Sequence, residues 1–270
     1  MGIENRLMKT LKHDMAKIKA TKPLIHHITN FVAMNDSANA TLAIGASPVM
    51  VHAHSELKEI LSAASALLIN IGTLDDYWIQ SMHIAADFAD DRIPILLDPV
   101  GAGATSLRTM TALQLLSAHR ISVVKGNYGE MMSLMGEENA VKGVDSLNVA
   151  VERVSELLKE FSMIHNTISV ATGEIDLFSD GKDIYFLRNG TEKLGSITAS
   201  GCMLGSVIAS FMAVQKDMLL AALEGAAVYS IAGELASDSR GVGSFRTTLL
   251  DSLSTITPED VMDRINLEKL

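Results

Sequence analysis

The chain has 270 residues, of which 48 % are hydrophobic and 20 % charged, and it carries a net charge of −10. The length is sufficient for one large domain or two small ones, and the acidic balance argues against nucleic acid, which basic side chains bind by neutralising phosphates. A single cysteine excludes a disulfide within the chain, and neither a signal-peptide core nor a run of 18 apolar residues is present, so we expect a cytoplasmic protein without a membrane partner.

Short apolar runs alternate with amphipathic segments along the chain. The apolar runs predict strands at residues 24–28, 48–51, 66–71, 94–97, 121–124 and 167–171. Helices are predicted between them, at residues 4–20, 31–44, 56–63, 74–89, 107–118, 128–135 and 145–161. Runs at 175–179 and 184–187, joined by Asp180-Gly181, predict a β-hairpin, and helices are expected at 202–214, 218–237, 245–254 and 258–268.

Alternation of this kind is typical of βαβ crossovers. We therefore expect one α/β domain over residues 1–270, with a mainly parallel central sheet covered by helices on both faces. Ligands of such sheets bind at the carboxyl ends of the strands. The segments that follow the predicted strands are therefore the places to look for a site.

The first such segment is Asp98-Pro-Val-Gly-Ala-Gly-Ala-Thr105. It matches neither the dinucleotide fingerprint nor the GxxxxGK[ST] phosphate loop, so a structural turn and a phosphate-binding turn both stay open. Asp98, at the strand end, is placed to hold a metal ion or a polar group of a substrate.

Two further strand ends carry polar residues. In one, Lys125 can meet a phosphate, and Glu130 falls three residues after Asn127, which also fits a purely structural capping box. Glu130 and Asp98 together can hold Mg²⁺ through water, because this ion keeps several waters in phosphate sites. In the other, the Thr172 hydroxyl can meet a phosphate, although an ordinary turn explains it equally well.

The single cysteine, Cys202, lies at the start of a predicted helix, directly after Ser200 and Gly201. The first turn of a helix presents unpaired N–H groups that favour an anion and lower the pKa of a thiol. A free cysteine is nevertheless often an inert buried residue, so both interpretations remain. His26 and His27 are adjacent on a strand and point to opposite faces, which argues against a shared metal site.

In their order, these motifs resemble those of the hydroxyethylthiazole kinases, which belong to the ribokinase-like superfamily. The resemblance spans nearly the whole chain and rests on residues 29–36, 45–50, 98–105, 127–130, 172–176, 200–202 and 243–245. It implies a three-layer ribokinase-like fold without a separate lid domain. It also implies ATP- and Mg²⁺-dependent phosphorylation of the hydroxyethyl group of 4-methyl-5-(2-hydroxyethyl)thiazole in thiamine salvage, by a homotrimer that binds the thiazole near the subunit interface.

The resemblance also implies roles for matching residues. Substrate contacts fall on Asn30, Met50 and Ala199; ATP and phosphate contacts on Lys125, Thr172, Ser200 and Gly201; Mg²⁺ on Asp98 and Glu130. Cys202 stands where most of the superfamily carries an aspartate base, and is expected to orient or deprotonate the alcohol.

The chain departs from the family pattern at Ala199, where Gly-x-Gly-Cys is usual. An alanine there is strained if the position requires a positive φ. Lys125 also binds a phosphate differently from an arginine, because its ammonium is a point charge and a guanidinium presents two parallel N–H donors.

Other functions stay open. Within the same fold, a pyridoxal- or hydroxymethylpyrimidine-type kinase and an ADP-dependent NAD(P)H-hydrate dehydratase are alternatives, although both typically carry aspartate at the helix entrance. A thiol enzyme with Cys202 as nucleophile and His26 or His27 as base, and a non-catalytic nucleotide-binding module, are alternatives from other classes.

Overall fold

A computed structural model describes residues 2–137 and 147–270. Within this part of the chain, nine strands form one sheet in the order β2-β1-β3-β4-β5-β6-β7-β8-β9. The strands are β1 (Leu24–Ile28), β2 (Ser47–Met50), β3 (Ala66–Asn70), β4 (Ile95–Asp98), β5 (Val123–Asn127), β6 (Ile168–Thr172), β7 (Asp176–Ser179), β8 (Ile184–Leu187) and β9 (Leu267–Lys269). Strands β1 to β6 pair in parallel, and β7, β8 and β9 add antiparallel, which confirms the mainly parallel sheet.

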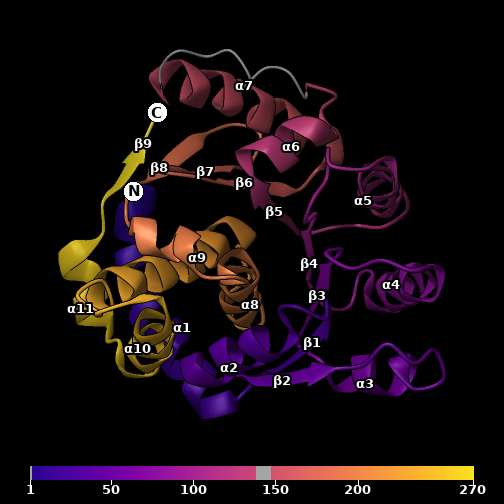
Figure 1. Ribbon diagram of the computed structural model, residues 1–270, viewed down its shortest axis with the longest axis horizontal. Helices are drawn as coiled ribbons and strands as arrows, with labels where there is room; N and C mark the ends of the chain where they lie inside the picture. The colour runs from indigo at the N-terminus through magenta and orange to yellow at the C-terminus, as the bar shows by residue number, and fades with distance from the viewer. Residues whose placement is uncertain (1, 138–146) are drawn as a thin grey trace.

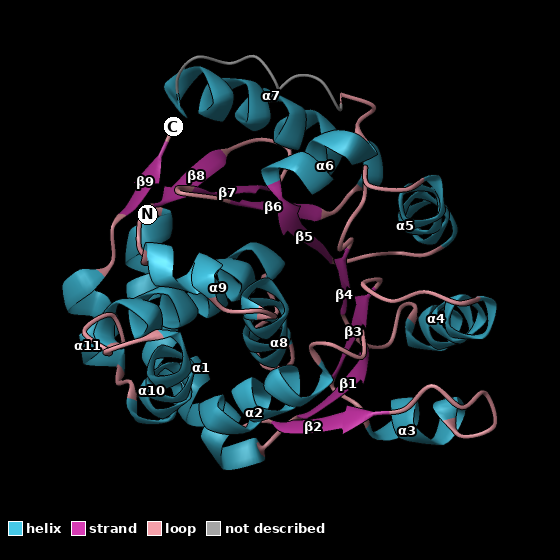
Figure 2. Cartoon of the chain, in the orientation of Figure 1, coloured by secondary structure: helices cyan, strands magenta, loops and turns pink. Residues whose placement is uncertain are grey.

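Helices cover both faces of this sheet (Figure 1). One face carries α3 (Leu57–Ala63), α4 (Asp76–Ala89), α5 (Ser106–Ala118), α6 (Tyr128–Leu134) and α7 (Leu147–His165). The other carries α1 (Ile3–Thr21), α2 (Met34–Ile44), α8 (Ser200–Met212), α9 (Met218–Leu235), α10 (Val242–Thr255) and α11 (Pro258–Arg264). Figure 2 shows the sheet curving around α8, so the expected three-layer α/β architecture is confirmed.

Each face of the sheet has its own apolar core. On the side of α8 the core is deep, because the helix is buried without interruption from Cys202 to Met212. The neighbouring helix α9 approaches closely at Gly225, where a Cβ atom would lie 2.7 Å from the Cα of Ile208. The start of α8 is therefore held by dense packing along the rest of the helix.

The helix α9 is also, among the described helices, the one with the length and apolar composition of a membrane span. Its 18-residue window is 83 % buried inside the fold, as in the core helix of a globular domain. Its apolar character is thus used in packing against α8 and α1.

The strand order reverses direction between β1 and β3. Strand β2 lies on one side of β1, and β3 with all later strands lies on the other. The helix after β1 packs with α8, whereas the helix after β2 packs with α4 on the opposite face. The carboxyl ends of β1 and β3 are therefore a topological switch point, the kind of place near which doubly wound sheets bind ligands.

Most predicted elements agree with the structure to within a few residues, but two differences stand out. The helix expected at residues 258–268 ends at Arg264, and Leu267–Lys269 forms β9 against β8. The strand forms because the buried Leu267 side chain joins the core and Arg188 N donates to Asn266 O (3.0 Å). The second difference is a 3₁₀ helix at Glu192–Ser196, which we label η1 and which was not predicted. Of the helix expected at 145–161, the first two residues lie outside the described part of the chain.

Candidate active site

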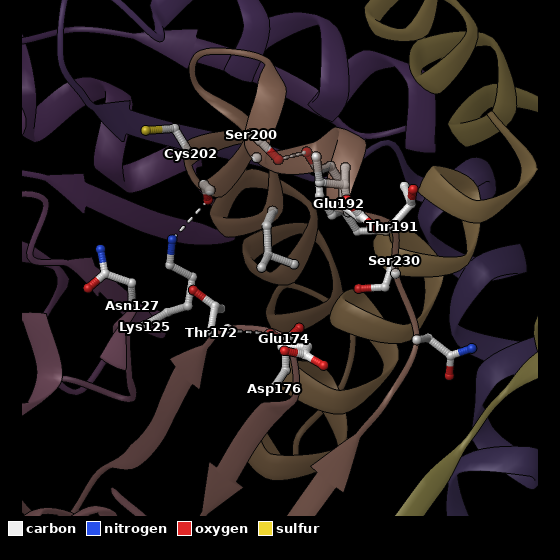
Figure 3. A pocket seen from close by; sticks show the side chains of 18 of the residues that line it. Lys125, Asn127, Thr172, Glu174, Asp176, Thr191, Glu192, Ser200, Cys202 and Ser230 are labelled. Atoms are coloured by element: carbon white, nitrogen blue, oxygen red, sulfur yellow. Dashed lines mark hydrogen bonds between the residues drawn. The ribbon is translucent and has the colours of Figure 1, made fainter. Parts of the chain in front are cut away.

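A cavity of about 1270 Å³ lies at the carboxyl ends of β4, β5 and β6 (Figure 3). We call it the cleft. Its walls are the turns after these strands, the segment 188–197 that contains η1, the first turn of α8, and two side chains of α9. The three strand-end motifs found in the sequence therefore converge on one space with the start of α8.

The first turn of α8 provides a place for an anion. The helix has 13 residues and begins at Ser200 after Ala199, which offers no side-chain cap to the first N–H groups. Ala199 has φ 64° and ψ 8°, so this position does require the left-handed region, and the alanine is strained there. The uncapped N–H groups and the partial positive charge of the helix terminus suit a phosphate.

A buried ion pair lies beneath this turn. The Nζ atom of Lys125 is 3.0 Å from Oδ2 of Asp98 and donates to the backbone oxygen of Gly201 at 2.9 Å. Burial is the largest single effect and opposes the charge on Lys125, but the attraction of Asp98, Cys202 and Glu130 together outweighs it and raises the pKa of the lysine. Lys125 stays protonated, and one of its three N–H donors remains for a phosphate.

Asp98 is almost fully buried, and burial raises its pKa to about 6 against the opposing effect of Lys125. Its other oxygen, Oδ1, is buried and has no hydrogen-bond partner. An orphaned carboxylate oxygen beside a phosphate site is the kind of ligand that Mg²⁺ takes.

Glu130 serves as a cap and also lines the cleft. Its Oε2 accepts from Asn127 N (2.7 Å), its Oε1 accepts from Gly101 N (2.8 Å), and Asn127 Oδ1 accepts from Glu130 N (2.9 Å). The capping interpretation is therefore confirmed. Asp98, with its unpartnered Oδ1, and Glu130 both line the cleft, and two carboxylates suit an ion that water and phosphate oxygens also hold.

Cys202 lies at the boundary between the cleft and the ends of β1 and β3. Its sulfur accepts hydrogen bonds from Nδ2 of Asn30 (3.5 Å) and Nδ2 of Asn70 (3.2 Å). Burial, followed by the charge of Asp98, raises the pKa of the thiol. The expectation of a lowered thiol pKa was wrong, because the side chain is 9 % exposed and lies near a carboxylate, so desolvation outweighs the helix terminus.

Sequence reasoning missed Asn70. It ends the fully buried strand β3 and pairs in register with Asp98 of β4. The available signal was a polar residue at the end of an apolar run, in the position that Asp98 occupies on the next strand.

The remaining predicted contacts divide into two groups. Thr172 lines the cleft with its hydroxyl donating to Gly126 O (3.3 Å), and Ser200 lines it with its hydroxyl 3.0 Å from that of Tyr229. Met50, at the end of the edge strand β2, is half-buried and lies outside the lining of the cleft. Asn30 contacts Cys202 from behind the cleft lining.

The two histidines have separate partners, as their alternation on β1 predicts. His26 Nε2 lies 2.7 Å from Val51 O, and His27 Nδ1 lies 3.0 Å from Ile25 O. Burial lowers the pKa of His27 to about 4. Neither histidine lines the cleft, which disfavours a role as base for a nucleophilic thiol.

Comparisons with known proteins agree with this geometry. The model of the "Hydroxyethylthiazole kinase family" matches residues 15–259. A hydroxyethylthiazole kinase from Archaeoglobus fulgidus is 56 % identical over 98 % of both chains. The structure of a hydroxyethylthiazole kinase protein from Pyrococcus horikoshii is 39 % identical, has a TM-score of 0.89 and covers 97 % of this chain and 99 % of that one.

A pyridoxal kinase from Staphylococcus aureus, in complex with pyridoxal, has a TM-score of 0.57 over 79 % of this chain and 88 % of its own, at 14 % identity, a likeness of fold alone. The family match and the two closer relatives establish the family as well as the fold, since they extend over nearly all of the sequence that builds the cleft. The chain therefore belongs to the hydroxyethylthiazole kinase family and has a ribokinase-like fold.

Proposed function

We propose that this chain transfers the γ-phosphate of ATP to the hydroxyethyl group of 4-methyl-5-(2-hydroxyethyl)thiazole, a reaction of thiamine salvage. One observation carries the proposal: the first turn of α8, the charged Lys125 and the thiol of Cys202 all border the same cleft. Family membership supports the choice of acceptor.

The phosphate is held where positive charge and free donors meet. Phosphoryl transfer passes through a loose transition state, so catalysis depends mainly on positioning and charge stabilisation. The N–H groups at the start of α8, in the segment from Ala199 to Cys202, point donors at the transferring group, and Lys125 lies beneath them against Gly201 O. Ser200 and Gly201 contribute backbone N–H groups at this point rather than large side chains.

The alcohol approaches from the other side of Cys202. In Figure 3 the sulfur points away from Lys125 toward the N-terminal strands of the fold. The thiol of Cys202, kept neutral by its raised pKa, orients the hydroxyl as a hydrogen-bond partner. The hydroxyl proton leaves late, after most of the bond between the γ-phosphorus and the leaving ADP oxygen has broken, and passes to an oxygen of the transferred phosphoryl group. Asn30 and Ala199 border this acceptor region.

Mg²⁺ would be held by Asp98, through its unpartnered Oδ1, and by Glu130 through water. When bound, the ion neutralises charge on the phosphates. The protonated Lys125 holds Asp98 in its orientation through their ion pair. Thr172, at the end of β6, contacts the nucleotide phosphates farther along the cleft.

We further propose that the chain acts as one domain, in the cytoplasm, as a homotrimer whose acceptor site is completed at the subunit interface. The position of Met50 supports the trimer, because this residue lies on an edge strand outside the cleft of its own chain. Phe31 and Val32, just after β1, are each 62 % exposed. Light scattering of the purified protein should give the mass of three chains.

A coupled assay tests the proposed function directly. The purified protein is given ATP and Mg²⁺ with the thiazole alcohol, pyridoxal or hydroxymethylpyrimidine as acceptor. The thiazole alcohol should give the highest kcat/KM. A preference for either of the other two alcohols identifies a different small-alcohol kinase, and ATP binding without phosphorylation of any acceptor identifies a non-catalytic module.

A further inference from the structure

Asn70 is a buried hydrogen-bonding junction at the carboxyl end of β3, beside the end of β1. Its Nδ2 donates to Cys202 Sγ (3.2 Å) and to Asp98 Oδ2 (3.0 Å). Its Oδ1 accepts from Asn30 Nδ2 (2.7 Å) and from Gly72 N (3.0 Å). With 0 % exposure, the side chain makes all four of these bonds without water.

This arrangement permits one orientation of the amide. The Gly72 N–H needs an acceptor, and the Asp98 carboxylate needs a donor. Turning the amide over would place two donors against each other and two acceptors against each other, and buried polar groups left in that state are costly. The N–H that reaches Cys202 is thus fixed in direction by the bonds on the other sides of Asn70.

The Asn70 amide is held in turn by the ion pair between Lys125 and Asp98. Asn70 and Lys125 donate to the same oxygen of Asp98, at 3.0 Å each. Asn70 therefore links the group that faces the phosphate with the sulfur that faces the alcohol. In Figure 3 this sulfur extends away from the labelled cleft residues, and its hydrogen-bond partners are Asn30, just after β1, and Asn70, at the end of β3.

We propose that Asn70 is the positioning residue of the acceptor site, holding the Cys202 sulfur in the place from which it contacts the reacting hydroxyl. The inference rests on the proposed function and deepens it. Asn70 is fully buried, so it acts through Cys202 and touches neither nucleotide nor alcohol.

The kinetic test is a double-mutant cycle of Asn70→Ser and Cys202→Ala. Asn70→Ser should lower kcat about tenfold through the lost hydrogen bond, while KM for ATP stays within about twofold. In the Cys202→Ala background the same change should cost only about twofold, the part that comes from the lost bond to Asp98, because the sulfur through which the rest acts is gone. An equal tenfold loss in both backgrounds, or no loss in wild type, overturns the proposal.

A second cycle uses melting temperature and needs no activity. If the two side chains are paired, the double variant should lose about 1–2 °C less than the sum of the single variants. Additive shifts overturn the proposal. A wild-type protein that phosphorylates no alcohol defeats the proposed function instead, and the melting cycle then decides whether Asn70 holds the Cys202 sulfur.

Ser169→Ala is the matched control for loss of a buried hydrogen bond. Ser169 is also 0 % exposed, bonds to Ser162 and to Leu158 O, and lies near the amino end of β6, away from the cleft. It should lower the melting temperature and leave kcat unchanged. If Asn70→Ser does not fold, Asn70→Thr replaces it, since threonine suits the strand conformation and also lacks the N–H that reaches the sulfur.

Discussion

Ala199→Gly should make the protein more stable. The left-handed conformation at φ 64° costs a residue other than glycine about 1–2 kcal/mol. Glycine removes this strain but adds about 0.4–1 kcal/mol of conformational entropy to the unfolded chain. The net gain is about 0.5–1 kcal/mol, or about 1–3 °C in melting temperature for a chain of this size. Because the backbone already adopts this conformation, kcat should stay within about twofold.

The assay is thermal unfolding without ligand, followed by circular dichroism. Ala213→Gly is the matched control at the other end of α8, where φ is −68° and ψ −20°. Glycine relieves no strain there and should cost about 0.5–1 kcal/mol. If Ala199→Gly lowers the melting temperature as much as Ala213→Gly does, then Ala199 is not strained and the reasoning fails.

Three further predictions concern the cleft. Cys202→Ser should lower kcat about tenfold at unchanged KM for ATP, measured by the coupled assay, and an unchanged kcat removes the thiol from the mechanism. Glu130→Gln should raise the Mg²⁺ concentration needed for half-maximal rate, and an unchanged Mg²⁺ titration argues against the metal role. The same change should lower the free energy of unfolding by about 1 kcal/mol, since one amide oxygen cannot replace both carboxylate acceptors. Burial raises the pKa of Asp176 from 3.8 to about 7, so the folded chain holds this proton longer than the unfolded chain, and stability should fall as pH rises through that interval. Asp176→Asn, which keeps an acceptor for Gly173 N, should show a smaller fall in urea unfolding between pH 5 and pH 8, and an identical fall contradicts the assignment.

The strands and most helices were predictable because local patterns decide them. Asn127 and Glu130, for example, form the capping box that their spacing indicates. The last strand was not predictable in this way. Leu267 continues a helical pattern locally, and only its pairing with Leu187, eighty residues earlier, makes it extended.

The site shows the same division between residue identity and environment. The motifs located Asp98, Lys125, Thr172 and Cys202 at one cleft, and the structure confirms that they share it. Burial could not be deduced from them. The protonation of Cys202 depends on how deeply α8 packs and on the nearness of Asp98, and both follow from tertiary contacts.

The packing around the cleft also decides how far its walls can adapt to a ligand. From Cys202 to Met212 the helix is enclosed by the sheet, α2 and α9, so its first turn cannot shift without disturbing the core. The opposite wall, residues 188–197, is held at several points: Asn189 and Gly190 donate to Glu234, Asn189 also bonds to Arg264 O and Asn266 N, and Lys193 donates to the backbone oxygens of Ser237 and Ser239. Both walls are therefore anchored, one in the core and one to α9 and the C-terminal segment, and the cleft meets a nucleotide as a largely preformed space.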